Sequence, residues 1–146
     1  MSNALTAPHV LEYPYTRSAG EVIGRFFAGL KERHIFGIRA RDGRVLVPPQ
    51  EYDPETSEAL DEWIEVADIG TVTTWSWVYE PREKHPLQQP FAFALIRLDG
   101  ADTALLHTVA AASPDAMKTG MRVRARWRPD PVGDITDILC FDPEVA

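Results

Sequence analysis

The order of apolar and polar side chains divides the sequence into a helical beginning and a long β-rich remainder. Apolar side chains recur three or four residues apart between Val22 and Leu30, which is the spacing of one face of an α-helix. Ser18 and Glu21 have the spacing of an N-terminal capping box. We therefore expect an amphipathic helix over residues 19–33. Its stripe, which includes Phe26, Phe27 and Leu30, docks on its own domain or faces another protein; the pattern favours the first alternative.

The clearest strand signal lies at residues 70–79, which are rich in β-branched and aromatic side chains. Strict alternation places two sets of side chains on opposite faces. One face carries Val72, Thr74, Ser76 and Val78, and the other carries Thr71, Thr73, Trp75, Trp77 and Tyr79. Three large aromatic side chains in one row need a cover, which is either a closed barrel or a partner.

Four further strands are expected after this one, at residues 91–98, 104–110, 121–128 and 135–141. They follow one another at regular spacing with turn residues between them. This arrangement is more typical of a five-stranded Greek-key barrel of the OB type than of a β-sandwich. The fold class predicted from the pattern is therefore mainly β, with a helix in front of the barrel.

Two turn-centred knuckles separate the helix from the barrel. Asp42-Gly43 lies between two apolar runs and favours a type I′ hairpin turn, and Pro48-Pro49 ends the second run. Residues 53–57 form a second turn. The predicted organisation is a lead-in and helix over residues 1–34, hairpin knuckles over 35–62, and a barrel over 63–146.

Composition excludes several classes of protein. The chain of 146 residues has 45% hydrophobic and 25% charged side chains, as in a soluble globular domain. Its net charge of −7 argues against general affinity for nucleic acid or for anionic membranes. We see neither an apolar run long enough for a membrane span nor a secretory signal, and we expect a cytoplasmic protein.

Side chains that carry chemistry are few. The histidines His9, His34, His85 and His107 form no metal-binding spacing, and Cys140 is the single cysteine. His107 lies in an apolar strand, where a satisfied core or rim histidine is the commoner interpretation and a catalytic base the rarer one. We recognise no catalytic motif, so the residues alone predict no catalytic site.

A row of arginines is the unusual electrostatic feature of this acidic sequence. Alternation puts four of them on one face of the strand at residues 121–128, namely Arg122, Arg124, Arg126 and Arg128. The row is either a solvated strand face with acidic partners, such as Asp134 and Asp137, or an anion site for phosphate or carboxylate. The first interpretation is slightly favoured.

The order of these segments resembles a known family. A helix is followed by residues 43–49, a second knuckle, residues 70–72, the strand at 90–98 and the segment at 120–123. From about residue 17 to residue 141, the chain is similar to the acyl-CoA-associated OB-fold proteins that carry a rubredoxin-like zinc ribbon, catalogued as domain of unknown function thirty-five. The resemblance implies an OB-fold with a ribbon-like region before it.

In that family each knuckle usually carries a cysteine pair that binds zinc. Here the first knuckle is shortened, and Asp53 and Thr56 stand where the second pair would be. We therefore expect no zinc and no other cofactor. A structural zinc stabilises a small finger by roughly 10 kcal/mol, so turn chemistry, packing or a partner must offset its loss.

The resemblance also implies a function. Family members look like non-catalytic subunits of thiolases and thiolase-like aldolases, and some occur fused to or beside hot-dog-fold hydratases. We expect an accessory subunit that binds and stabilises a thiolase-like acyl-CoA enzyme, most similar to the retro-aldolase of steroid side-chain degradation, in a hetero-oligomer built around an enzyme dimer. The candidate partner interface is Phe26, Phe27, Leu30, Trp75, Trp77 and Tyr79, and the candidate acyl-CoA contact is the arginine row.

Two alternatives from other classes stay open. Trp75, Trp77 and Tyr79 would stack bases in a single-stranded nucleic-acid binder. His107 or His85 would serve as base in a stand-alone acyl-CoA hydratase or hydrolase.

Overall fold

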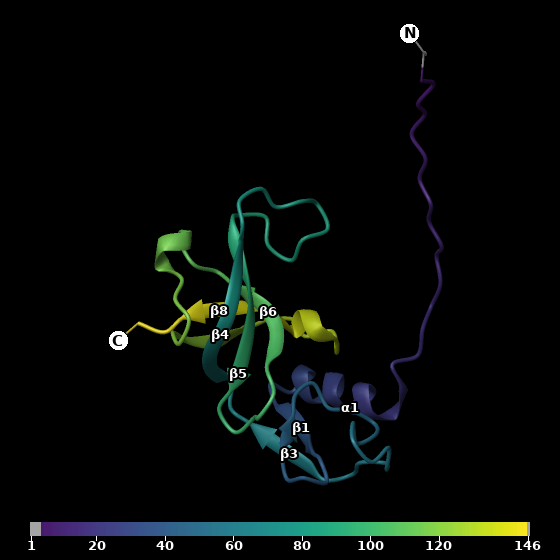
Figure 1. Cartoon of the computed structure of the whole chain (residues 1–146), viewed down its shortest axis with the longest axis vertical. Coiled ribbons are helices and arrows are strands. Elements are labelled where there is room, and N and C mark those ends of the chain that lie inside the picture. The colour runs from purple at the N-terminus through teal and green to yellow at the C-terminus, as the bar shows by residue number, and fades with distance from the viewer. Residues whose placement is uncertain (1–3, 146) are drawn as a thin grey trace.

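In the computed structural model, which describes residues 4–145, a helix and a small sheet lie beside a closed β-barrel (Figure 1). The small sheet has three strands in the order β2-β1-β3, and the barrel has five in the order β4-β5-β6-β8-β7. The predicted OB-type barrel with one helix before it is therefore confirmed. No helix within residues 4–145 has both the length and the apolar composition needed to cross a membrane.

Helix α1 spans Gly20–Lys31, within the predicted range. The predicted capping box is wrong: the N-cap is Ala19 and no side chain caps the first turn. Ser18 instead accepts a hydrogen bond from the amide of Gly20 at 3.3 Å. The apolar stripe docks on the protein itself, because Leu30 is fully buried and Phe26 is only 2% exposed.

The small sheet contains β1 (Ile35–Arg39), β2 (Val45–Leu46) and β3 (Trp63–Val66). The predicted start of the barrel domain at residue 63 places β3 in the barrel. In the structure β3 instead pairs antiparallel with β1. Trp63 packs against a separate small core, made by Ile38, Ala40, Leu46 and Leu60. The barrel strands begin six residues later, because the apolar pattern of a strand does not specify which neighbour it pairs with.

The first knuckle is a hairpin, but not with the predicted type I′ turn. A type I′ turn needs positive φ at both central residues, and here only Gly43 has it, at 92°. The carbonyl of Ala40 accepts a hydrogen bond from Gly43, and the amide of Ala40 donates to Arg44. This is the three-residue loop in which a type I turn is followed by a left-handed glycine.

Asp53 holds the two knuckles together. Its side chain is buried, and its carboxylate accepts hydrogen bonds from the amides of Arg41 at 2.8 Å and of Glu55 and Thr56 at 2.9 Å. These amide donors, led by that of Arg41, lower the pKa of Asp53 to about 2. A carboxylate thus links both knuckles at the position where the family resemblance placed a metal ligand.

The barrel has five strands, and the pairing register shifts at two places, between Val72 and Thr74 and between Arg126 and Trp127. The strands are β4 (Ile69–Val78), β5 (Phe91–Leu98), β6 (Leu105–Val109), β7 (Arg122–Trp127) and β8 (Ile138–Pro143). Two short 3₁₀ turns accompany them, η1 (Pro114–Ala116) and η2 (Ile135–Asp137). The last strand therefore starts three residues later than residue 135, where the sequence pattern predicts it.

A β-bulge in β4 changes which side chains face the core. Thr73 is the extra residue between Val72 and Thr74, so the alternation of inner and outer positions shifts by one residue there. Trp75 and Trp77 consequently join Val72 on the inner side and pack against the core. The small alanines of β5 stand opposite both tryptophans. The barrel itself supplies the cover that these rings require.

Candidate functional site

The arginine row on β7 is largely neutralised. Arg122, Arg124 and Arg126 lie on the outer face, as predicted, and each pairs with at least one carboxylate. The pairs are Arg122 with Asp99 at 2.5 Å, Arg124 with Asp68 at 3.1 Å and Glu144 at 3.2 Å, and Arg126 with Asp142. The interpretation as a solvated strand face therefore fits these three residues.

The expected acidic partners, Asp134 and Asp137, have other roles. The carboxylate of Asp134 accepts hydrogen bonds from the amide and hydroxyl of Thr136 and so caps η2. Asp137 is buried, and its carboxylate accepts hydrogen bonds from the amides of Val132 and Gly133. The true carboxylate partners come from the segment before β4, from the turn after β5, and from β8 and the residue that follows it, which a single-strand pattern does not reveal.

Arg128 differs from the rest of the row. Among residues 4–145 no carboxylate oxygen lies within 4.0 Å of its guanidinium group. One of its terminal nitrogens donates to the hydroxyl of Thr136 at 3.1 Å. The side chain lies at the edge of a pocket, so Arg128 is the member of the row whose charge stays available to a ligand.

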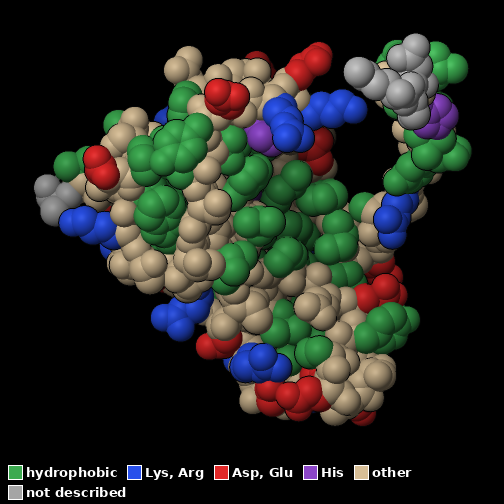
Figure 2. All heavy atoms as spheres, turned by 45° about the horizontal axis from the view of Figure 1, so that its top comes forward, with side chains coloured by type: hydrophobic (Ala, Val, Ile, Leu, Met, Phe, Trp, Pro, Cys, Tyr) green, Lys and Arg blue, Asp and Glu red, His purple; other side chains and the backbone are tan. Residues whose placement is uncertain are grey.

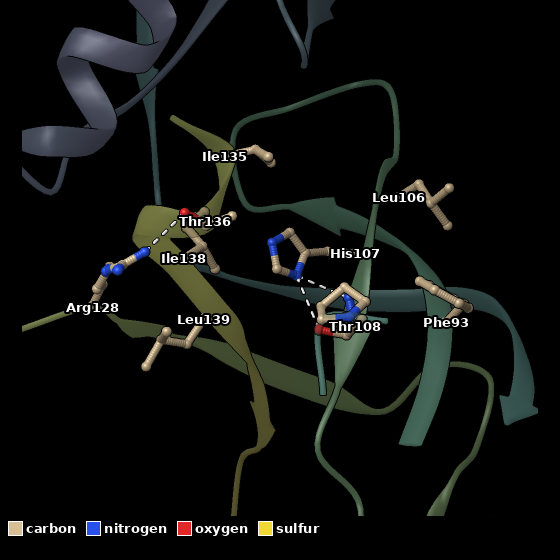
Figure 3. Close-up of a pocket in the computed structure, with 10 residues that line it drawn as sticks. Phe93, Leu106, His107, Thr108, Arg128, Ile135, Thr136, Ile138 and Leu139 are labelled. Carbon is tan, nitrogen blue, oxygen red and sulfur yellow. Dashed lines mark hydrogen bonds between the residues drawn. The ribbon is translucent and has the colours of Figure 1, made fainter. Parts of the chain in front are cut away.

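That pocket has a volume of about 420 Å³ and lies where β5, β6 and β8 meet η2 (Figure 3). Its lining is mainly apolar, with a few polar groups. The apolar side chains are Pro86, Phe93, Leu106, Ile135, Ile138 and Leu139, and the polar ones are His107, Thr108, Arg128 and Thr136.

His107 lies beside this pocket, where β6 and β8 meet. β6 and β8 are joined by a single parallel pair, Val109 with Phe141, and the imidazole packs edge-on against the Phe141 ring. Its Nδ1 accepts a hydrogen bond from the amide of Thr108 at 2.8 Å. Burial lowers the pKa of His107, although hydrogen bonds to the main chain of nearby residues oppose the shift. This is the environment of a satisfied rim histidine.

No pair of side chains at the pocket has the arrangement of a nucleophile and its base. The hydroxyl of Thr108 lies 3.4 Å from Nδ1 of His107, but Thr108 is only 1% exposed. The same nitrogen already accepts the Thr108 amide. Cys140 is buried, and burial raises the pKa of its thiol. His85 accepts a hydrogen bond from the amide of Arg82 and packs on Phe91 and Phe93.

A second hollow, of about 430 Å³, lies between α1 and the barrel. Its lining includes Ile23 and Phe27 from the helix and Leu95 from β5, and it shares Leu106 and Ile135 with the first pocket. We call the two hollows together the apolar groove. Figure 2 shows apolar side chains gathered in the middle of this face. Leu106 is 61% exposed and lines both hollows, so it belongs to a contiguous apolar patch.

The predicted partner interface is only partly accessible. Phe26 and Leu30 are buried, and Trp75 and Trp77 pack against the core. Phe27 lines the apolar groove, while Tyr79 is 71% exposed beyond the end of β4.

Sequence reasoning missed Leu95, Leu106 and Ile135. A signal exists for the first of these. The strand at residues 91–98 is almost continuously apolar, and such runs are typical of strands covered on both faces. In the isolated chain, the outward-facing side chains of β5 line the apolar groove, so no second layer covers them there.

Comparisons with known proteins agree with this architecture. Residues 63–128 match the model of a family described as the C-terminal OB-fold domain of ChsH2. This segment is thus similar to an OB-fold domain of known type. The resemblance to the domain of unknown function thirty-five (DUF35) family is confirmed. No curated protein matches the sequence.

Two solved structures share the fold. One is a protein of unknown function from the DUF35 family of Sulfolobus solfataricus, with 26% identity and a TM-score of 0.58, covering 73% of this chain and 78% of that chain. The other is described as the Ltp2-ChsH2(DUF35) aldolase, with 21% identity and a TM-score of 0.62. That alignment covers 92% of this chain and 100% of the other.

Proposed function

We propose that this protein is a non-catalytic accessory subunit that binds and stabilises a thiolase-superfamily acyl-CoA enzyme. The partner that fits best is a thiolase-like retro-aldolase of steroid side-chain degradation, in a hetero-oligomer around an enzyme dimer. The observation that carries the proposal is the alignment with a chain of the Ltp2-ChsH2(DUF35) aldolase, which runs over nearly the whole length of both chains. The apolar groove supports it, because an exposed apolar surface of this kind marks interaction sites.

The two alternative functions, a nucleic-acid binder and a stand-alone hydratase or hydrolase, have no comparable support. A nucleic-acid binder needs free cations beside exposed aromatic rings. Here Trp75 and Trp77 pack against the core and three arginines of the row pair with carboxylates. A stand-alone hydratase or hydrolase needs an accessible base, whereas the Nδ1 atom of His107 and that of His85 already accept main-chain hydrogen bonds.

The accessory role extends to the entrance for the CoA ester. In this proposal Arg128 is the contact for a CoA phosphate, because its guanidinium has no carboxylate partner among the described residues and borders an open pocket. Arg122, Arg124 and Arg126 contribute less, since their charge is already matched.

Co-expression tests the proposal. The chain is produced together with the enzyme of the same genome that is most similar to Ltp2, and the molar mass of the purified complex is measured by light scattering. We expect a stable hetero-oligomer and a higher melting temperature for the enzyme. A partner at 100 times its Kd stabilises the enzyme by about 2.7 kcal/mol.

An unrelated cytosolic enzyme serves as the control for non-specific association. Separate elution of the two proteins at micromolar concentration, with an unchanged melt of the enzyme, would refute the accessory role. Turnover of acyl-CoA esters by the isolated chain, abolished by His107→Ala, would support the hydratase or hydrolase alternative instead.

A further inference from the structure

Residues 4–19 form an arm that precedes α1 and has neither helix nor strand. In Figure 1 this arm runs away from the rest of the molecule. Its apolar side chains are open to solvent: Leu11 is 67% exposed, Tyr13 73% and Tyr15 78%. Exposed apolar surface of this size is costly in water. A purely connecting role therefore does not explain these side chains, whereas a binding role does.

The composition of the arm suits an extended binding segment. Pro8 and Pro14 oppose helix formation, and Leu11, Tyr13 and Tyr15 occupy alternate positions, so they point to one side when the chain is extended. Glu12 is the single carboxylate between residues 4 and 16. The binding surface that matches this arm is therefore apolar and needs little charge.

The arm and the apolar groove form a continuous surface. A third hollow, of about 310 Å³, is lined by Arg17, Ser18 and Ala19 at the base of the arm and by Ile23 and Phe27 of the helix. Ile23 and Phe27 also line the groove. In Figure 2 the arm projects beside the face on which apolar side chains gather, and it joins the body at its base. A partner seated on that face would lie within reach of the arm.

We propose that the arm and the apolar groove together form the docking surface for the enzyme partner, with the arm laid in extended form along an apolar strip of that enzyme. This inference rests on the proposed function. A second copy of this chain is the less suitable occupant, because two bodies with a net charge of −7 each repel one another. The partner must present an apolar strip on a surface that is not itself strongly acidic.

Full-length variants in the complex with the enzyme test the proposal. The arm variant combines Leu11→Ser, Tyr13→Ser and Tyr15→Ser, and the groove variant is Leu106→Ser. Val145→Ser is the matched control, because Val145 is 92% exposed and lines none of the three hollows. We expect the Kd for the enzyme, measured by titration calorimetry, to rise at least about tenfold for the arm variant and for the groove variant. The control should change it less than about twofold.

The melting temperature of each free variant separates docking from folding. The exposed positions predict an unchanged melt, and the milder change Leu106→Ala replaces Leu106→Ser if that variant destabilises the chain. Wild-type affinity in the arm variant would overturn the inference while leaving the accessory function intact. An unmodified chain that does not bind the enzyme would overturn both. A dimer of the free chain that dissociates only in the arm variant would overturn the enzyme as occupant in favour of a second copy.

Discussion

Phe26 and Phe27 are neighbours on one helix, and the structure predicts opposite consequences for their removal. Phe26 is 2% exposed and belongs to the main core, next to Leu30. Phe27 is only partly buried and lines the apolar groove. Replacing each by alanine therefore distinguishes core packing from interface packing with the same chemical change.

The expected magnitude for Phe26→Ala follows from its burial. Truncation of a buried phenylalanine removes its apolar contacts and leaves a cavity, which costs about 3–5 kcal/mol. The total stability of a domain of this size is about 5–15 kcal/mol, so the change removes a large share of it. At about 3 °C per kcal/mol, the melting temperature should fall by roughly 10–15 °C. For Phe27→Ala we expect less than about 1.5 kcal/mol, because part of the ring is already in water.

Urea denaturation followed by tryptophan fluorescence measures both variants on the free chain, and calorimetric titration with the enzyme partner measures docking. Phe27→Ala should weaken binding although it lowers the melting temperature much less than Phe26→Ala does. Equal stabilities of the two variants, or a larger loss for Phe27→Ala, would refute the assignment of Phe26 to the core and of Phe27 to the groove.

Four further outcomes follow from single side chains. Metal analysis should find no stoichiometric zinc, and chelator should not change the melting temperature, because Asp53 links the knuckles; one zinc per chain would contradict this. Because the pKa of Asp53 is lowered to about 2 from 3.8, its stabilising contribution should be complete above pH 3.8 and disappear as the pH falls towards 2, and Asp53→Asn should remove that dependence. The lowered pKa of His107 means that the unfolded chain binds its proton first, so stability should fall as the pH drops below 6.5, and the fall should be smaller in His107→Gln. In the enzyme complex, Arg128→Gln should raise the KM for the CoA ester and high salt should reduce the difference, whereas the ion-paired control Arg124→Gln should leave KM unchanged; equal KM values would exclude Arg128 from the entrance.

Local side-chain patterns determined the elements of this protein. The apolar spacing from Val22 to Leu30 placed the helix, and alternation placed Arg122, Arg124 and Arg126 on one face of β7, whereas Arg128 lies beyond the end of that strand. Turn residues between apolar runs identified the five strands of the barrel. These features depend on side chains a few residues apart, so they can be inferred without knowing what packs against them.

Features that depend on distant segments were decided by the tertiary structure alone. The bulge at Thr73 turned Trp75 and Trp77 towards the core, because β4 must follow the register of β5 on one side and of β7 on the other. The carboxylates that neutralise the arginine row come from positions 16 to 56 residues away along the chain. The apolar groove exists only because α1, β5, β6 and η2 meet there, so no local pattern marks Leu106 as exposed.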